Sequence, residues 1–181
     1  MSLSGEKGRY RKQELKSMAM DWLARRGVSV ADMAALVYEI QKEYIPGLSL
    51  DGCRESVERV LEKREVQNAV FTGLTLDTLA EQRLVSEPLL DMLQRDDGLY
   101  GIDEILALSV VNIYGSIGLT NFGYLDKVKM GIIGVVNQHK GPQVNTFLDD
   151  IVAAIAAAAA ARMAHRARDM EEEKEQQLPP A

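Results

Sequence analysis

Two adjacent carboxylates, Asp149 and Asp150, stand directly before an uncharged, alanine-rich run at residues 151–161. Alanine is the best helix former, so we expect the pair in the first turn of a helix, where the helix dipole favours negative charge. Alanine side chains let neighbouring backbones approach closely, which predicts a buried, central helix. A charge removed from water needs a partner. That partner can be backbone N–H groups, a lysine or a metal ion.

The same part of the chain holds other oxygen ligands and a lysine. Asp103 and Glu104 also precede an apolar segment, and Asp126 lies three residues before Lys129. Carboxylates with few balancing cations favour a hard divalent ion such as Mg²⁺, which takes oxygen ligands and commonly bridges to a phosphate. A lysine can contact that phosphate as a point charge. The candidate ligands are therefore Asp103, Glu104, Asn112, Asp126, Asp149 and Asp150.

A structural interpretation of the same residues stays open at this point. Acidic residues are common helix N-terminal caps, each stabilising a helix by about 1 kcal/mol. Asp126 and Lys129 are spaced to form an ion pair on one helix. A cap needs one carboxylate and each acidic pair supplies two, which favours a ligand site modestly.

Composition and charge exclude several functions. Of the 181 residues, 27 are acidic and 21 are Lys or Arg, giving a net charge of −6. Because no Lys/Arg-rich block interleaves with aromatics, we expect no nucleic-acid partner. The single Cys53 excludes an internal disulfide and fits a reducing cytoplasm. The longest apolar run, 151–161, is shorter than the ~18–20 residues of a membrane span. This predicts no transmembrane segment and at most peripheral membrane contact.

The elements that must position these residues are predicted to be helices. Ser29 and Ser49 are typical N-terminal caps, and Thr72-Gly73 is a candidate interruption. Three glycines make residues 115–123 a turn-rich stretch. Helices are expected at about 10–26, 29–44, 49–61, 62–82, 89–95, 102–113 and 132–136, with a helix or turn around 125–129, a loop at 139–142 and the long alanine helix ending near Met170.

These elements indicate an all-α protein with a single compact domain over residues 10–170. A central apolar helix would be surrounded by about five or more other helices. Residues 11–97 would form an outer shell, and residues 98–161 would supply the apolar centre. Residues 1–9 and the acidic, proline-containing residues 171–181 are expected to be flexible.

Three segments resemble, in order and approximate spacing, the C-terminal motifs of the phosphatidylglycerophosphatase A family. They are GIDEI (101–105), LDKVK (125–129) and LDDIVA (148–153). EKREVQNA (62–69) and IGLTNFGY (117–124) are similar to its soluble branch, the low-temperature-requirement C proteins. The chain departs from the family pattern at Met130, where the motif has proline. It also lacks a counterpart of the family's N-terminal Pro-Gly-Thr…Gly-Ser segment.

The resemblance implies a fold in which several helices surround a central helix. It also implies Mg²⁺-dependent, or Mn²⁺-dependent, hydrolysis of a phosphate monoester, either phosphatidylglycerophosphate or a related phospholipid or soluble phosphate. By motif match, the metal ligands would be Asp103, Glu104, Asp126, Asp149 and Asp150. The catalytic residues would be Glu104, Lys129, Asp149 and Asp150.

The alternative is a non-catalytic helical interaction protein with a degenerate site, involved in cold or stress adaptation. Under either hypothesis we expect a cytoplasmic protein. We also expect a homo-oligomer, because the helical shell leaves Met and Leu positions exposed.

Overall fold

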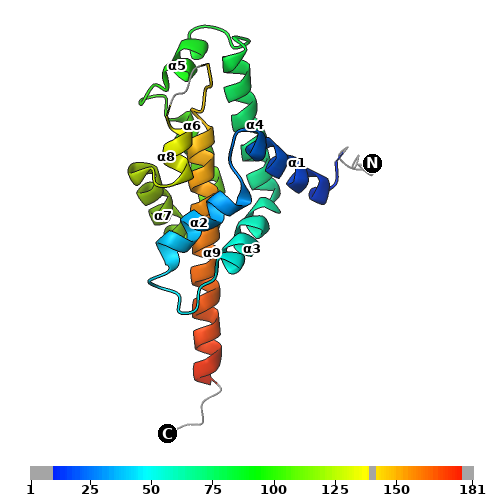
Figure 1. The fold of residues 1–181 in the computed structure, drawn as a ribbon. Helices are drawn as coiled ribbons and strands as arrows, with labels where there is room; N and C mark the ends of the chain where they lie inside the picture. Colours follow the sequence, from blue (N-terminus) through cyan, green and yellow to red (C-terminus); the bar gives the residue numbers. More distant parts are fainter. Residues whose placement is uncertain (1–9, 139–141, 177–181) are drawn as a thin grey trace, which may run out of the picture.

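The computed structural model describes residues 10–138 and 142–176, and every regular element within these ranges is helical. The long helix α9 (Leu148–Gln176) forms the axis of the molecule, and its C-terminal end projects beyond the other helices (Figure 1). The fold is all-α, with one compact domain around a central apolar helix, as predicted. The remaining elements are α1 (Lys12–Arg25), α2 (Val30–Gln41), α3 (Leu50–Leu61), α4 (Arg64–Glu81), α5 (Leu89–Arg95), α6 (Ile102–Val111), the short 3₁₀ helix η1 (Asn112–Tyr114), α7 (Gly115–Val128) and α8 (Ile132–Val136).

Helix α9 is central because its side chains are small. Every residue from Ile151 to Ala161 is fully buried, and α2, α3, α4, α6 and α7 all pack against α9. A methyl group is the smallest side chain that still excludes water, so alanine lets several helices approach one axis at once. The alanine run therefore accounts for the arrangement of helices around α9.

The local signals for helix ends are confirmed where they involve serine caps. The side chain of Ser29 accepts a hydrogen bond from the backbone N–H of Asp32 (3.1 Å), and Asp32 accepts one in return from the Ser29 N–H (2.8 Å). Ser49 accepts a hydrogen bond from the N–H of Gly52 (3.1 Å). These bonds satisfy amides that a helix start leaves unpaired.

The predicted turn-rich stretch at 115–123 is wrong, because it forms most of the continuous helix α7. Gly118 lies against η1 and the end of α6, where an added Cβ would be 3.0 Å from the carbonyl oxygen of Val111. Glycine is thus needed for close packing at this position. The predicted interruption at Thr72-Gly73 is also wrong, since α4 continues through it.

Helix α9 continues to Gln176, beyond its expected end near Met170. The predictions for residues 1–9, 139–141 and 177–181 lie outside the described residues.

The hairpin of α6 and α7 brings two distant parts of the chain to the N-terminus of α9. The ring of Tyr100, just before α6, makes an edge-on contact with the ring of Phe147 (centroids 5.9 Å apart). At the other end of the hairpin, Lys129 follows α7 and contacts the first turn of α9. The start of α6 and the end of α7 therefore lie at the same end of α9.

We expect Gly73→Ala to destabilise the protein by about 1–3 kcal/mol, because its methyl group would overlap the core. An added Cβ at Gly73 would lie 2.8 Å from the Cβ of Phe147 and closer still to Ile151. Gly123→Ala is the matched control within an exposed part of α7, where an added Cβ meets no atom within 4 Å. It should stabilise by about 0.5–1 kcal/mol, because alanine favours helix. Urea unfolding of both variants tests the difference, and equal stabilities would contradict it.

Candidate functional site

The ammonium group of Lys129 lies at the meeting point of three carboxylates. Its Nζ is 2.7 Å from Asp126 Oδ1, 2.8 Å from Asp149 Oδ2 and 3.5 Å from Asp150 Oδ1. Asp126 belongs to the last turn of α7, whereas Asp149 and Asp150 belong to the first turn of α9. The structure thus brings two of the predicted segments together around one cation, and Lys129 and Asp149 are 20 residues apart in the chain.

The four side chains differ in access to solvent. Those of Asp149 and Asp150 are 6% and 5% exposed, whereas those of Lys129 and Asp126 are 29% and 33% exposed. Asp149 and Asp150 therefore form the floor of the cluster, and Asp126 and Lys129 form its edge. A ligand from solvent would meet the edge first.

Burial and mutual charge together set the electrostatics of Asp149, Asp150 and Lys129. Burial, the adjacent charge of Asp149 and the Asp126 carboxylate raise the pKa of Asp150 to about 8, although Lys129 acts in the opposite direction. Burial also raises the pKa of Asp149 above its usual range, again opposed by Lys129. For Lys129 itself, burial lowers the pKa, but the carboxylates of Asp149, Asp126 and Asp150 outweigh burial and keep it above its ordinary value. The carboxylates therefore favour the charged form of Lys129, whereas burial disfavours ionisation of Asp149 and Asp150.

The backbone at Lys129 explains how its side chain reaches the cluster. Lys129 terminates α7 in the left-handed conformation (φ 49°), and its N–H donates to the carbonyl oxygen of Leu125 (2.8 Å). Few non-glycine residues adopt this conformation. Gly134, in α8, packs directly on the Lys129 carbonyl oxygen, so a larger residue there would displace it. The left-handed turn and the close contact with α8 hold Lys129 over the first turn of α9.

A buried aspartate of α4 caps α9. The carboxylate of Asp77 accepts hydrogen bonds from the backbone N–H groups of Phe147 and Leu148, both at 3.1 Å. Asp77 is fully buried, and burial raises its pKa well above the usual range against these two bonds and the charge of Arg26. Because Asp77 accepts the hydrogen bonds from these two amides, Asp149 and Asp150 keep most of their hydrogen-bonding capacity for Lys129 and for a ligand.

The segment before α9 is fixed by contacts with several elements. Arg26 donates to the carbonyl oxygen of Val144 and to the Asn145 side chain (2.6 Å), and it pairs with Glu81 (2.7 Å). The Asn145 amide donates to the carbonyl oxygen of Val136 (2.8 Å). These bonds join α1, α4 and α8 to the chain just before Asp149 and Asp150. The first turn of α9 is therefore held in place on several sides.

The second predicted acidic pair does not join the Lys129 cluster. Asp103 and Glu104 lie in the first turn of α6, where Asp103 accepts a hydrogen bond from the Glu104 N–H (3.0 Å). Within residues 10–138 and 142–176, no hydrogen bond or ion pair connects either residue to Lys129. Burial and the charge of Glu104 raise the pKa of Asp103 to about 6. Asn112, the amide among the candidate ligands, lies exposed in η1.

The family model described as phosphatidylglycerophosphatase A matches residues 19–165 of the chain. The chain belongs to the phosphatidylglycerophosphatase A family. This match includes α2 to α8 and the buried part of α9, and so covers every residue of the Lys129 cluster.

Several relatives support the same assignment. The chain is 54% identical to the uncharacterized protein YutG of Bacillus subtilis (strain 168) over 166 residues, 92% of this chain and 99% of the relative. The crystal structure of YpjQ from Bacillus subtilis is 54% identical, with a TM-score of 0.85, over 89% of this chain and 99% of that one. The low temperature requirement C protein from Listeria monocytogenes is 58% identical, with a TM-score of 0.84, over 88% and 100%.

The donor set has the chemistry of a hard-cation site, but its geometry is that of an ion-pair cluster. Carboxylate oxygens are the ligands that Mg²⁺ prefers. Among the residues that the structure describes, however, no group of three or more His, Cys, Asp or Glu side chains is arranged to hold a metal ion. The Lys129 ammonium lies between the carboxylates instead. A metal bound here would need oxygens from water or substrate to complete its ligands.

Asp77 and Arg26 are the residues that sequence reasoning missed. Asp77 follows Val66, Val70 and Leu74 on the buried stripe of α4, where an acidic residue is out of place unless it has a buried partner. That position was the available signal for Asp77. No comparable signal marked Arg26, because its partners lie far away in the chain, with a separation of 119 residues for Asn145.

We expect Asp77→Ala to destabilise the protein by roughly 2–4 kcal/mol, because two amides at the start of α9 lose their acceptor. Asp91→Ala, an exposed aspartate in the first turn of α5, is the control and should cost less than about 1 kcal/mol. Chemical denaturation with circular dichroism measures both. A midpoint for Asp77→Ala equal to that of wild type would show that Asp77 does not cap α9.

Proposed function

We propose that this protein is a Mg²⁺-dependent phosphatase that hydrolyses a phosphate monoester. The observation that carries the proposal is the convergence of Asp126, Asp149 and Asp150, from two family motifs, on one cation position. Membership of the phosphatidylglycerophosphatase A family supports the reaction class.

Charge balance supports a second cation in the cluster. Lys129 supplies one positive charge opposite three carboxylates, and two of these are almost completely buried. One carboxylate would suffice to neutralise a lysine. The remaining acidic oxygens suit a divalent ion, Mg²⁺ or Mn²⁺, and that ion suits a phosphate as a further ligand.

The roles of the residues follow from their positions. Asp126 and Lys129, at the exposed edge, would meet the incoming phosphate, and the ammonium would offset its negative charge. Asp149 and Asp150, at the buried floor, would hold the ion from the protein side, and one of these carboxylates would serve as general base for water. The ion would polarise a phosphoryl oxygen and lower the pKa of a bound water.

The Asp103–Glu104 pair is proposed as a further ligand set of the same site. The contact between Tyr100 and Phe147 places the start of α6 beside the start of α9. Glu104 is half-buried and the Asp103 side chain carries a raised pKa of about 6. From the start of α6, these two carboxylates would approach a substrate bound at Lys129.

The proposed substrate is a phosphate ester with its phosphate accessible from solvent. Phosphatidylglycerophosphate is the substrate that the family name indicates, and a related phospholipid or a soluble phosphate would present the same group. We propose a cytoplasmic protein, with peripheral membrane contact if the ester is a lipid.

We expect Mg²⁺ and Mn²⁺ to bind wild-type protein and not the Asp149→Asn/Asp150→Asn double variant, because the variant replaces both buried carboxyl groups by amides. Isothermal titration calorimetry, with and without inorganic phosphate, measures this directly. The phosphate arm reveals a site that needs a phosphate oxygen to complete its ligands. Turnover of p-nitrophenyl phosphate and of phosphatidylglycerophosphate in detergent micelles should be lost in the same variant.

Asp51→Asn/Asp91→Asn is the matched control, since both residues are exposed and lie in the first turns of other helices. It should bind and turn over like wild type. Folded wild-type protein that binds neither cation in either arm and hydrolyses neither ester would contradict the proposed function.

A second candidate is a non-catalytic interaction protein, and the Lys129 cluster favours it in one respect. The ammonium already contacts all three carboxylates, so the buried charges have a partner without a metal. Under this hypothesis the cluster stabilises the junction of α7 and α9, and adding Mg²⁺ does not change the stability of the protein.

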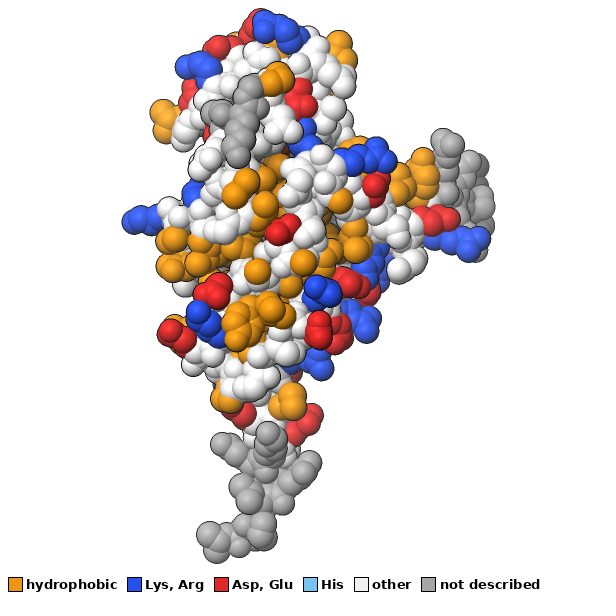
Figure 2. Space-filling model, viewed as in Figure 1, with side chains coloured by type: hydrophobic (Ala, Val, Ile, Leu, Met, Phe, Trp, Pro, Cys, Tyr) orange, Lys and Arg blue, Asp and Glu red, His pale blue; other side chains and the backbone are white. Residues whose placement is uncertain are grey.

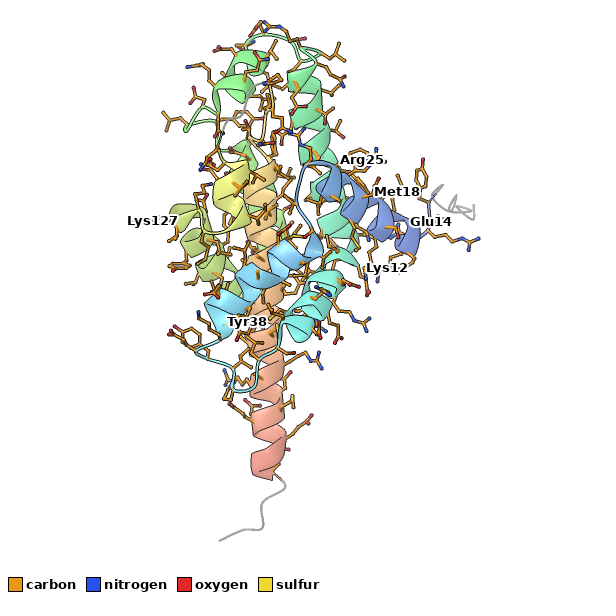
Figure 3. The ribbon with its side chains drawn as sticks, viewed as in Figure 1. Lys12, Glu14, Met18, Arg25, Tyr38 and Lys127 are labelled. Atoms are coloured by element: carbon orange, nitrogen blue, oxygen red, sulfur yellow. The ribbon has the colours of Figure 1, made fainter. Side chains whose placement is uncertain are left out.

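This second candidate predicts that Lys129→Met destabilises by about 1–3 kcal/mol, after allowance for solvent screening of the partly exposed lysine. Lys127→Met is the control from the same helix, since Lys127 points away from the body (Figure 3). Thermal unfolding in EDTA and in Mg²⁺ separates the two candidates, because a ligand that binds only the native state raises its melting temperature. A melting temperature of wild type that rises with Mg²⁺ would contradict the second candidate.

A further inference from the structure

A hollow lined mainly by cations lies further along α9, away from its N-terminus. Its walls come from α1, the junction of α3 and α4, η1 and α9. The lining residues are Lys12, Arg59, Glu62, Lys63, Tyr114 and Arg162. The volume of about 400 Å³ is in the range of small-molecule sites. We call this hollow the basic pocket.

The basic pocket is separate from the Lys129 cluster. Asp150 lies in the first turn of α9, and Arg162 lies about three turns further along the same continuous helix. At 1.5 Å per residue, these two positions are roughly 18 Å apart along the helix axis. A phosphate held at Lys129 would therefore not reach the basic pocket.

The carboxylate in the basic pocket is already paired. Glu62 forms ion pairs with Lys16 (3.2 Å) and with Arg59 (3.4 Å). Within the described ranges, no ion pair involves the other three cations of the pocket: Lys12, Lys63 and Arg162. The pocket therefore presents three positive charges that have no acidic partner.

The buried Gln67 holds the start of α1 beside the end of α3. Its side-chain amide donates to the carbonyl oxygens of Leu61 (2.8 Å) and Lys12 (3.4 Å). Lys12 lies at the start of α1, on the side of α3 (Figure 3). Figure 2 shows Lys and Arg side chains below α1 and beside α3, with acidic side chains among them. The fold thus brings cations from distant parts of the chain around one hollow.

Helix stability accounts for only some of these cations. Arg59 and Lys63 lie at the C-terminal end of α3, where the helix dipole favours positive charge. Lys12 lies in the first turn of α1, where the same dipole disfavours it. Arg162 comes directly after the buried alanine run, and its guanidinium donates to the Ser56 hydroxyl (3.3 Å). The meeting of all four cations is therefore not explained by the ends of helices.

The basic pocket also contains an unused hydrogen-bond donor. Among the described residues, the buried hydroxyl of Tyr114 has no hydrogen-bond partner. Burial raises the pKa of Tyr114, although the charge of Arg162 acts in the opposite direction. The hydroxyl therefore keeps its proton at neutral pH. An acceptor oxygen that enters beside Tyr114 would give this donor a partner.

We propose that the basic pocket binds an anion that carries a phosphate group. A phosphate monoester has a charge of about −1.5 to −2 at neutral pH, whereas a carboxylate has one negative charge, so phosphate is the better match for three unpaired cations. Guanidinium groups form bidentate bonds with phosphate, and lysines contact it as point charges. The net charge of the chain is −6, so an anion is attracted by this local group of cations and not by the protein as a whole. This site is additional to the proposed catalytic one.

Isothermal titration calorimetry with inorganic phosphate and pyrophosphate, in the absence of divalent cations, tests the proposal. Wild type should show saturable binding. Lys12→Gln/Lys63→Gln should weaken it at least about tenfold, because two charge-assisted contacts are lost. Both side chains are exposed and form no ion pair in the described structure, so circular dichroism should show an unchanged fold. Arg162→Gln is a second variant, and it should weaken binding in the same direction.

Arg54→Gln/Arg83→Gln is the matched control, because it removes the same amount of charge from two exposed residues outside the basic pocket. It should bind like wild type. Equal affinities of the Lys12→Gln/Lys63→Gln variant and this control would overturn the proposal. The Asp149→Asn/Asp150→Asn variant should also bind like wild type. Loss of binding in that variant would assign the anion to the Lys129 cluster and overturn the proposal as well.

Co-sedimentation with vesicles of phosphatidic acid and phosphatidylcholine distinguishes two sources of the phosphate. Association that is lost in Lys12→Gln/Lys63→Gln would identify a lipid headgroup, whereas binding of pyrophosphate without co-sedimentation would identify a soluble anion. Wild type that binds neither the soluble anions nor the vesicles would overturn the proposal. Because these measurements contain no Mg²⁺ or Mn²⁺, their failure is distinct from failure of the proposed function.

Discussion

The structure depends on satisfying the polar start of a helix whose N-terminal half is buried on all sides. Helix α9 can be surrounded because its side chains are mostly methyl groups, but its first amides and its two carboxylates then also lie away from water. Asp77 accepts hydrogen bonds from the amides, and Lys129 forms ion pairs with the carboxylates. Each partner comes from a different helix, so α4, α7 and α9 must meet at one point. The positions of α1 and α8 follow, because Arg26 and Val136 hold the segment that leads into α9.

The helical fold was predictable because its signals are local. Apolar spacing, serine caps and the alanine run each depend on a few neighbouring residues, and they locate α2, α3 and α9. The stretch at 115–123 was mispredicted because glycine disfavours helix locally. In the folded chain, Gly118 instead permits a close contact with the carbonyl oxygen of Val111. Packing against η1 and α9 outweighs the local preference, and no pattern within α7 reveals that contact.

The candidate site was predictable in composition and less so in geometry. Asp126, Lys129, Asp149 and Asp150 were all named from the sequence, and they meet in space. Which acidic side chains surround Lys129 depends on how the chain turns back between α6 and α7. The spacing of apolar residues does not determine that turn. The cap by Asp77 joins residues 70 and 71 positions apart. Since acidic residues at helix starts are common caps, the sequence could not separate the capping carboxylate from those left for other contacts.

Stability alone does not account for the composition of the cluster. A buried ion pair is about as stable as apolar residues of the same size, and often less so. A structural junction between α7 and α9 would therefore need at most one carboxylate for Lys129. The chain places three there, and the burial of Asp149 and Asp150 raises the pKa of both carboxyl groups. The proposed cation and phosphate site would use this excess of carboxylates, with the partly exposed Lys129 at its solvent edge. The number of carboxylates therefore agrees with the proposed ligand site, whereas packing of α7 on α9 would not need all three.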